Sequence, residues 1–112
     1  MELTEQKKEN HVVIGIHGRL DTTNYSQLEK KLMDLIDSGS NRILVDCKNM
    51  DYVSSSGLRV FLMALKKITQ AGGKFMLCSL QENIREIFEI SGFSSIFEIC
   101  SETDEAAAAF AK

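Results

Sequence analysis

Two short and almost unbroken apolar runs, at residues 42–47 and 74–79, constrain the fold of this chain more than any other feature of its sequence. Runs of this kind are typical of strands that are buried on both faces of a sheet. Each run is preceded by a segment whose apolar residues recur at helical spacing, which predicts an amphipathic helix. These helical positions are Tyr25, Leu28, Leu32, Leu35 and Ile36 before the first run, and Leu58, Phe61, Leu62, Leu65 and Ile68 before the second. Strands that alternate with helices predict an α/β domain with a largely parallel sheet.

Segments on either side extend this pattern to the order β-β-α-β-α-β-α-β-α. We expect a β-branched strand over 11–18, a weaker edge strand over 3–7 beside it, a short helix over 82–91 and a last strand over 94–99. Thr103 is expected to cap a final helix, and Gly39 and the Gly72-Gly73 pair to end the two long helices. The 112 residues suit a single domain, 1–112, with a mixed, largely parallel sheet of four to five strands and about four helices.

Composition narrows the class of protein. The net charge is −3, from 13 basic and 16 acidic residues, which argues against a nucleic-acid binder. No apolar run approaches the roughly 20 residues that a membrane span needs. The first eight residues lack the apolar core of a signal peptide. We therefore expect a cytoplasmic protein, a monomer, that binds neither nucleic acid nor a membrane.

Residue types that bind metals or catalyse reactions are scarce. Cys47, Cys78 and Cys100 lie in separate apolar runs without a C-x-x-C pair, which predicts buried thiols in a reducing compartment rather than a zinc site. His11 and His17 bracket one strand and are interpreted as surface residues. The sequence contains no Walker A, G-x-G-x-x-G or G-x-S-x-G motif. We expect no metal, no cofactor and no enzymatic activity.

The most informative segment is the serine triplet Ser54-Ser55-Ser56, followed by Gly57, where a buried strand gives way to the second long helix. A helix cap explains one serine. A glycine within a helix costs about 0.8–1 kcal/mol relative to alanine, so Gly57 suggests a backbone left open to close approach by another molecule. A helix N-terminus also stabilises an added phosphate, which brings about −1.5 to −2 charges. The segment therefore favours a phosphorylation switch on a binding surface.

The chain resembles the STAS domain, and specifically the small free-standing anti-anti-sigma factors (anti-sigma-factor antagonists) of bacteria. The resemblance covers nearly the whole chain and is carried by Gly18-Arg19-Leu20-Asp21, by residues 53–58, by Gly72-Gly73 and by Ser91-Gly92-Phe93. The family's switch segment usually reads D-S-S-G-L, with the first serine phosphorylated. Aligned on Gly57-Leu58, that serine is Ser55, and the usual acidic residue is replaced by Ser54. Ser54 and Ser56 remain alternative phosphorylation sites.

The resemblance also implies a mechanism. Proteins of this family bind an anti-sigma factor that is also a serine kinase with a histidine-kinase-like ATPase fold. The unphosphorylated antagonist sequesters this kinase and frees the sigma factor. Phosphorylation breaks the complex, and a metal-dependent serine phosphatase restores it. The family's strand-end acidic residue, which supports partner recognition, matches Asp21, and Thr22, Thr23 and Asn24 are expected to form the other side of the contact surface.

The second long helix carries more apolar residues near its start than one inward stripe needs, since Val60 and Met63 accompany the helical positions given above. Ser56, Arg59 and Met63 share one helix face. If that face is exposed, it forms an apolar patch with a polar rim beside the serines. Alternatively, Val60 and Met63 pack against a neighbouring helix. The expected partner-binding residues are thus Asp21, Thr22, Thr23, Asn24, Ser54, Ser56, Gly57, Arg59 and Met63.

Two other functions stay open at this point. The first is a STAS subunit of a stressosome-like scaffold or of a lipid-transport ABC complex, for which the switch would be absent or different. The second is a small nucleotide-binding or hydrolytic enzyme that uses Ser55, for which His11 and His17 are the only histidines able to act as a base. The intact serine triplet and the length of the chain favour the antagonist.

Overall fold

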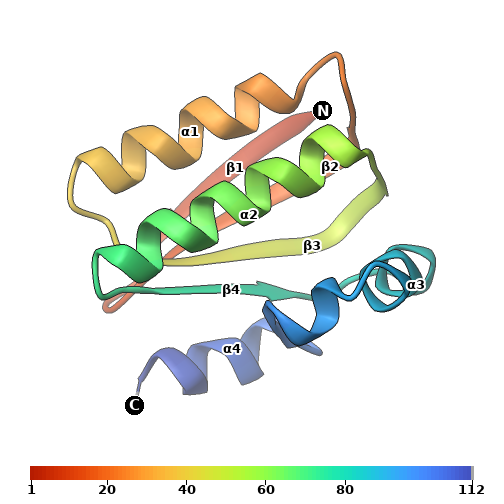
Figure 1. Ribbon diagram of the computed structural model, residues 1–112. Helices are drawn as coiled ribbons and strands as arrows, with labels where there is room; N and C mark the ends of the chain where they lie inside the picture. Colours follow the sequence, from red (N-terminus) through yellow and green to blue (C-terminus); the bar gives the residue numbers. More distant parts are fainter. Residues whose placement is uncertain (112) are drawn as a thin grey trace.

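The computed structural model describes residues 1–111, which form a five-stranded sheet with helices on both faces (Figure 1). The strands are β1 (Glu2–Lys7), β2 (Val12–Leu20), β3 (Arg42–Val53), β4 (Lys74–Cys78) and β5 (Glu98–Cys100). The helices are α1 (Tyr25–Asp37), α2 (Ser55–Gln70), α3 (Glu82–Ile90) and α4 (Thr103–Phe110), with a short 3-10 turn η1 (Phe93–Ser95) before β5. The predicted fold class is confirmed.

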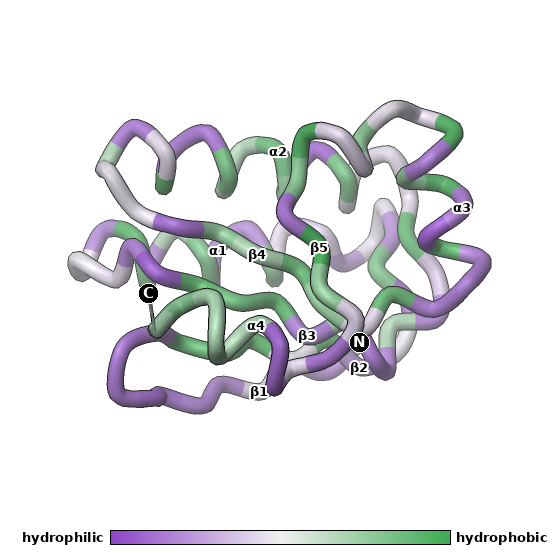
Figure 2. The backbone as a smooth tube through the Cα atoms, turned by 90° about the horizontal axis from the view of Figure 1, so that it is seen from below, coloured by the Kyte–Doolittle hydropathy of each residue, from purple (hydrophilic) through white to green (hydrophobic). Residues whose placement is uncertain are grey.

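The strands lie side by side in sequence order, β1-β2-β3-β4-β5. The β1–β2 pair is antiparallel and every other pair is parallel. Right-handed crossovers that all advance in one direction place their helices on the same face of a sheet. Accordingly, α1 and α2 pack side by side on one face, and α3 joins the same apolar core (Figure 1). Within residues 1–111, only α4 lies against the other face, where it contacts β3, β4 and β5 (Figure 2).

Side chains alternate between these two cores along the central strands. Ile43 and Val45 of β3 face α1 and α2, whereas Leu44 between them faces α4 and packs near Met76 and Phe110. All five side chains are at most 2% exposed. The unbroken apolar run that predicted β3 is therefore a strand with a core on each side.

Glycines end both long helices, as predicted. Gly39 and Gly72 adopt the left-handed conformation, with φ of 97° and 75°. After α1, the Gly39 N–H donates to the Ile36 carbonyl at 3.0 Å and the Ser40 N–H donates to the Leu35 carbonyl at 2.9 Å. This pair of bonds satisfies carbonyls that the helix leaves free, and it requires a residue that tolerates positive φ.

The strand β3 is twice as long as the predicted run, since it continues from Cys47 to Val53. Its register against β2 shifts twice, because β3 advances three residues from Asp46 to Asn49 while β2 advances two, and again gains a residue between Met50 and Tyr52. These are bulges, which bend a strand and break the alternation of inward and outward side chains. Sequence alternation therefore could not reveal the second half of β3.

Three other predictions are wrong. The last strand is only Glu98–Cys100, because Phe93 and Phe97 turn inward against Phe88 and the chain between them forms η1. Thr103 is the first residue of α4 and not its cap, which is Glu102. His11 is also not a surface residue, since it is 7% exposed and stacks on Phe110 with ring centroids 4.5 Å apart.

Candidate functional site

The serine triplet lies at the carboxyl ends of two neighbouring parallel strands. Leu20 at the end of β2 pairs with Val53 at the end of β3. The Ser54 N–H then donates to the Leu20 carbonyl at 2.9 Å. Asp21 and Ser54, each the first residue beyond its strand, therefore leave the sheet at the same point. Because α1 and α2 both begin at this edge, the loop 21–24 and the serines form one surface region (Figure 1).

The three serines differ in what they do. Ser54 has an extended backbone, and its hydroxyl oxygen accepts the Gly57 N–H at 3.3 Å, so it is the N-cap of α2. Ser55 is the first residue of the helix and is exposed. Ser54 and Ser56 are half-buried. A modifying enzyme would thus meet the Ser55 hydroxyl most readily, and the choice of Ser55 remains a prediction.

The expected role of Gly57 is wrong. Gly57 is buried and faces the interior. A Cβ atom at this position would lie 2.7 Å from Cγ of Leu20 and 3.0 Å from Cγ2 of Val53. The glycine therefore lets the start of α2 rest directly on the ends of β2 and β3, and it does not open the backbone to a second molecule.

Asp21 is held in a fixed orientation at the surface. Its Oδ1 accepts the Thr23 hydroxyl at 2.6 Å and the Thr23 N–H at 3.0 Å. Its Oδ2 lies 3.5 Å from Nε of Arg19. The bonds from Thr23, followed by the Arg19 charge, hold the pKa of Asp21 below its usual value. The loop therefore presents a fixed negative charge beside the serines.

Asn24 occupies the N-cap position of α1 but does not cap the helix. Its side chain instead closes the loop, since Oδ1 accepts the Asp21 N–H at 2.9 Å and Nδ2 donates to the Arg19 carbonyl at 2.9 Å. Thr22 and Thr23 are exposed, as the prediction of a contact surface requires.

Sequence reasoning missed Tyr52, which belongs to the same surface. Its ring lies beneath the guanidinium of Arg19, at 4.0 Å from the ring centroid, and the tyrosine is 39% exposed. The second bulge of β3 brings Tyr52 opposite Arg19. No sequence signal marks such a pairing, because a bulge depends on how two strands register.

The outer face of α2 continues the surface away from the serines. Arg59 is exposed and Met63 is half-buried, whereas Val60 is buried in the core. Val60 therefore packs in the interior, whereas Arg59 and Met63 contribute to the surface of the helix. A groove of about 640 Å³ runs along the helix and is closed on one side by the exposed Ile96. Its other lining residues are Arg59, Leu62, Met63, Leu65, Lys66, Thr69 and Gln70.

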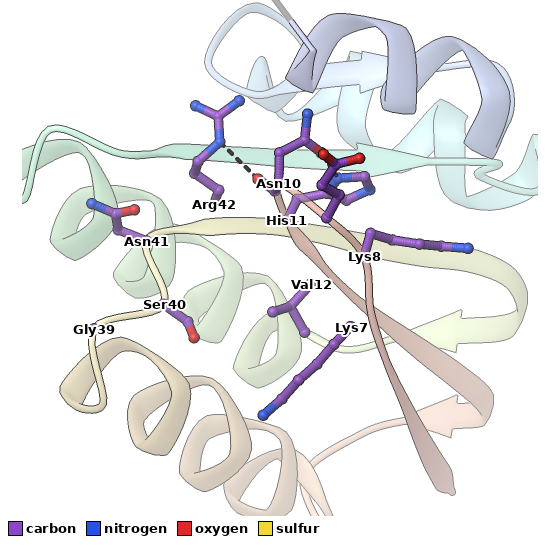
Figure 3. A pocket seen from close by; sticks show the side chains of 10 residues that line it. Lys7, Lys8, Asn10, His11, Val12, Gly39, Ser40, Asn41 and Arg42 are labelled. Carbon is purple, nitrogen blue, oxygen red and sulfur yellow. Dashed lines mark hydrogen bonds between the residues drawn. The ribbon is translucent and has the colours of Figure 1, made fainter.

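A second hollow, of about 400 Å³, lies at the opposite ends of β2 and β3, between the β1–β2 turn and the segment 39–42 (Figure 3). Arg42 lines it, and the Nε of this side chain donates to the Asn10 carbonyl at 2.8 Å. An Nη2 hydrogen bond from the same guanidinium reaches the Phe110 carbonyl. Arg42 thereby ties the end of α4 to the sheet, and this hollow is separate from the serines.

The histidines do not approach Ser55. His11 lines the hollow at the far end of the sheet. His17 lies on the sheet face opposite α2. Its ring is near Gly15, on the side of β2 opposite to Ile14 and Ile16, which pack in the core with α1 and α2. Neither imidazole is placed to act as a base for a serine at the start of α2.

The three cysteines are free and buried, as predicted. Burial raises the pKa of Cys47 and Cys100, and raises that of Cys78 to about 11. Among residues 1–111, no group of His, Cys, Asp or Glu side chains is arranged to hold a metal ion. In the same part of the chain, no helix has the length and apolar character needed to cross a membrane.

The order of the strands, together with the serines at the start of α2 beside the ends of β2 and β3, defines a STAS domain. The family model of the STAS domain matches residues 2–106, and the chain belongs to this family. It is 41% identical over 110 residues to a Bordetella bronchiseptica protein named as an anti-sigma factor antagonist, BtrV, covering 98% of this chain and 95% of that protein.

Solved structures agree on the fold. An anti-sigma factor antagonist from Thermotoga maritima superposes with a TM-score of 0.94 at 22% identity, over 98% of this chain and 95% of that one. The Bacillus cell fate determinant SpoIIAA, solved in its phosphorylated form, gives a TM-score of 0.78 at 21% identity, over 99% and 100% of the two chains.

Proposed function

We propose that this protein is an anti-sigma factor antagonist that works by partner switching. Its unphosphorylated form binds a kinase-like anti-sigma factor and so frees a sigma factor, and phosphorylation of Ser55 ends the binding. The observation that carries the proposal is the exposed Ser55 at the start of α2, beside the ionised Asp21. The relationship to BtrV, which is named as an anti-sigma factor antagonist, supports the antagonist role.

The chemistry at Ser55 is a phosphoryl transfer in which this protein is the substrate. The γ-phosphoryl group of ATP, bound by the partner kinase, passes to Oγ of Ser55, the hydroxyl proton is released and ADP is the other product. A metal-dependent serine phosphatase reverses the change by hydrolysis. In this proposal the chain is one STAS domain, acts in the cytoplasm and catalyses nothing itself.

The contact surface of the proposal joins the loop 21–24 to the outer face of α2. Ionised Asp21 and the exposed Thr22 and Thr23 form one side. Exposed Arg59 and half-buried Met63 form the other. Ser55 lies between them, so a phosphate there changes the charge in the middle of the surface by about −1.5 to −2.

Purification of the protein from resting and stressed cells tests the proposal. Mass spectrometry should find phosphate on Ser55 in one condition and a kinase-like anti-sigma factor bound in the other. With that partner in hand, calorimetry should show that Ser55→Glu weakens binding at least tenfold, whereas Ser55→Ala binds like the unmodified protein. Equal affinity of all three forms would contradict the switch.

Asp21→Ala provides a second measurement on the same partner. We expect slower phosphorylation or weaker binding with the domain still folded by circular dichroism. Asp37→Ala, which removes an exposed carboxylate at the other end of α1 and outside the proposed contact surface, is the comparison for unspecific effects of a lost charge. Normal phosphorylation and affinity of Asp21→Ala would remove Asp21 from the proposed contact surface.

A further inference from the structure

Ser55 and Arg59 are one helical turn apart on α2, and both are exposed. Residues four apart in a helix are neighbours on its surface. Helical side chains also lean toward the N-terminus, so the side chain of Arg59 is long enough to reach back to a phosphate on Ser55. A phosphate on Ser55 would therefore have a guanidinium within reach on its own helix.

Arg59 has no competing partner among residues 1–111. The ion pairs in this part of the chain use Arg19, Lys30, Lys31 and Lys74. No acidic residue lies in the first turn of α2. The guanidinium can thus bind a phosphate without breaking an existing ion pair in the described structure.

The other nearby arginine is already engaged. Arg19 forms an ion pair with Asp21, with Nε and Oδ2 3.5 Å apart, and its guanidinium lies over the ring of Tyr52. Moving it to a phosphate would leave Asp21 without its cation, directly beside a new dianion. Of the two arginines, Arg59 can therefore bind the phosphate at the lower cost.

We propose that phosphoserine 55 is bound within the same molecule by the guanidinium of Arg59. The inference rests on the proposed function, since it takes Ser55 as the modified residue. It adds a second consequence of phosphorylation. The surface gains a dianion at the start of α2 and, one turn further on, loses a free cation that the partner would otherwise contact. Guanidinium groups suit this role because they bind phosphate oxygens in a bidentate manner.

The experiment measures the second ionisation of the phosphate itself. Phosphoserine is installed at position 55 by genetic code expansion, and its 31P chemical shift is followed against pH at low salt. A neighbouring guanidinium favours the dianion, so the phosphate pKa should lie below its ordinary value of about 6. Arg59→Gln should raise this pKa by roughly 0.2–0.4 units, as expected for an exposed helical ion pair.

Two further variants make the result specific. Lys67→Gln removes an exposed cation from the same helix, about 18 Å from Ser55 along the helix axis, and should leave the phosphate pKa unchanged. Arg19→Gln tests the rival arginine. The proposal is overturned if Arg59→Gln matches the unsubstituted phosphoprotein within 0.1 units, or if Arg19→Gln produces the larger shift. Neither kinase nor anti-sigma factor takes part, so this result is independent of whether Ser55 is the site modified in cells.

Discussion

Gly57 gives the sharpest test of how the start of α2 is built. Alanine normally stabilises a helix by about 0.8–1 kcal/mol relative to glycine. At this position, however, a Cβ atom would lie 2.7 Å from Cγ and 2.8 Å from Cδ2 of Leu20. Carbon atoms in contact are about 3.5–4.0 Å apart, so the helix and the strand end would have to separate by roughly 0.8 Å.

The expected magnitude follows from these two opposing effects. Leu20 is fully buried, so its side chain has no solvent into which it can move. Overpacking of this kind costs about 1–3 kcal/mol. After the gain in helix propensity, Gly57→Ala should lower the free energy of unfolding by about 1 kcal/mol. Urea denaturation should show this as a lower midpoint with an unchanged slope.

A double-mutant cycle with Leu20→Ala isolates the contact. Leu20→Ala alone should cost about 2–5 kcal/mol. In that background the added Cβ of Gly57→Ala has room, so the substitution should become neutral or stabilising, and the coupling energy should be about 1–2 kcal/mol. Val53→Ala relieves only the longer contact of 3.0 Å and should give a smaller coupling. Additive effects, or stabilisation by Gly57→Ala in the unsubstituted protein, would refute the close approach.

Three further predictions concern the frame around the site. A Cβ at Gly73 would lie 1.9 Å from the backbone oxygen of Asn41. Gly73→Ala should therefore lower the free energy of unfolding by about 3 kcal/mol or more, and the melting temperature by at least about 10 °C. A normal melting curve would contradict this. Ser54→Ala should lower the free energy of unfolding in urea by about 1 kcal/mol, because it removes the N-cap of α2. Ser54→Asp should retain stability, because a carboxylate also caps a helix. Equal losses for the two variants would show that the cap is not involved. Burial, followed by nearby cations, lowers the pKa of His11, so the folded state binds fewer protons than the unfolded chain. Stability should therefore decline as the pH falls below about 6.5, by at most about 1.4 kcal/mol per pH unit. His11→Phe should remove this decline.

Local pattern was sufficient for most of the fold. The runs that became β3 and β4 carry apolar residues at nearly every position, and the long helices repeat them at helical spacing. Gly39 marked a helix end because a left-handed residue is needed there. Each of these signals lies within a single helix or strand, so it can be recognised without knowing which other elements pack against it.

The failures share the opposite property, since each depends on contacts between distant segments. His11 is buried because α4, about a hundred residues later, places Phe110 on its ring. The second half of β3 depends on bulges in its register with β2. The segment predicted as a strand over 94–99 turns instead, because Phe93 and Phe97 both pack against Phe88. None of these contacts leaves a periodic trace in the sequence.

Leu20 explains how the proposed phosphorylation of Ser55 would act through charge with the fold kept intact. Its carbonyl binds the Ser54 N–H, its side chain limits the approach at Gly57, and the next residue is Asp21. One buried residue thus fixes the start of α2 relative to the loop that carries the acidic side chain. A hydroxyl at Ser55 projects from this fixed corner into solvent, so an added phosphate displaces no core atom. The backbone around Ser55 has little freedom to move the phosphate elsewhere. The added charge would therefore act directly on the affinity of a partner that binds this region.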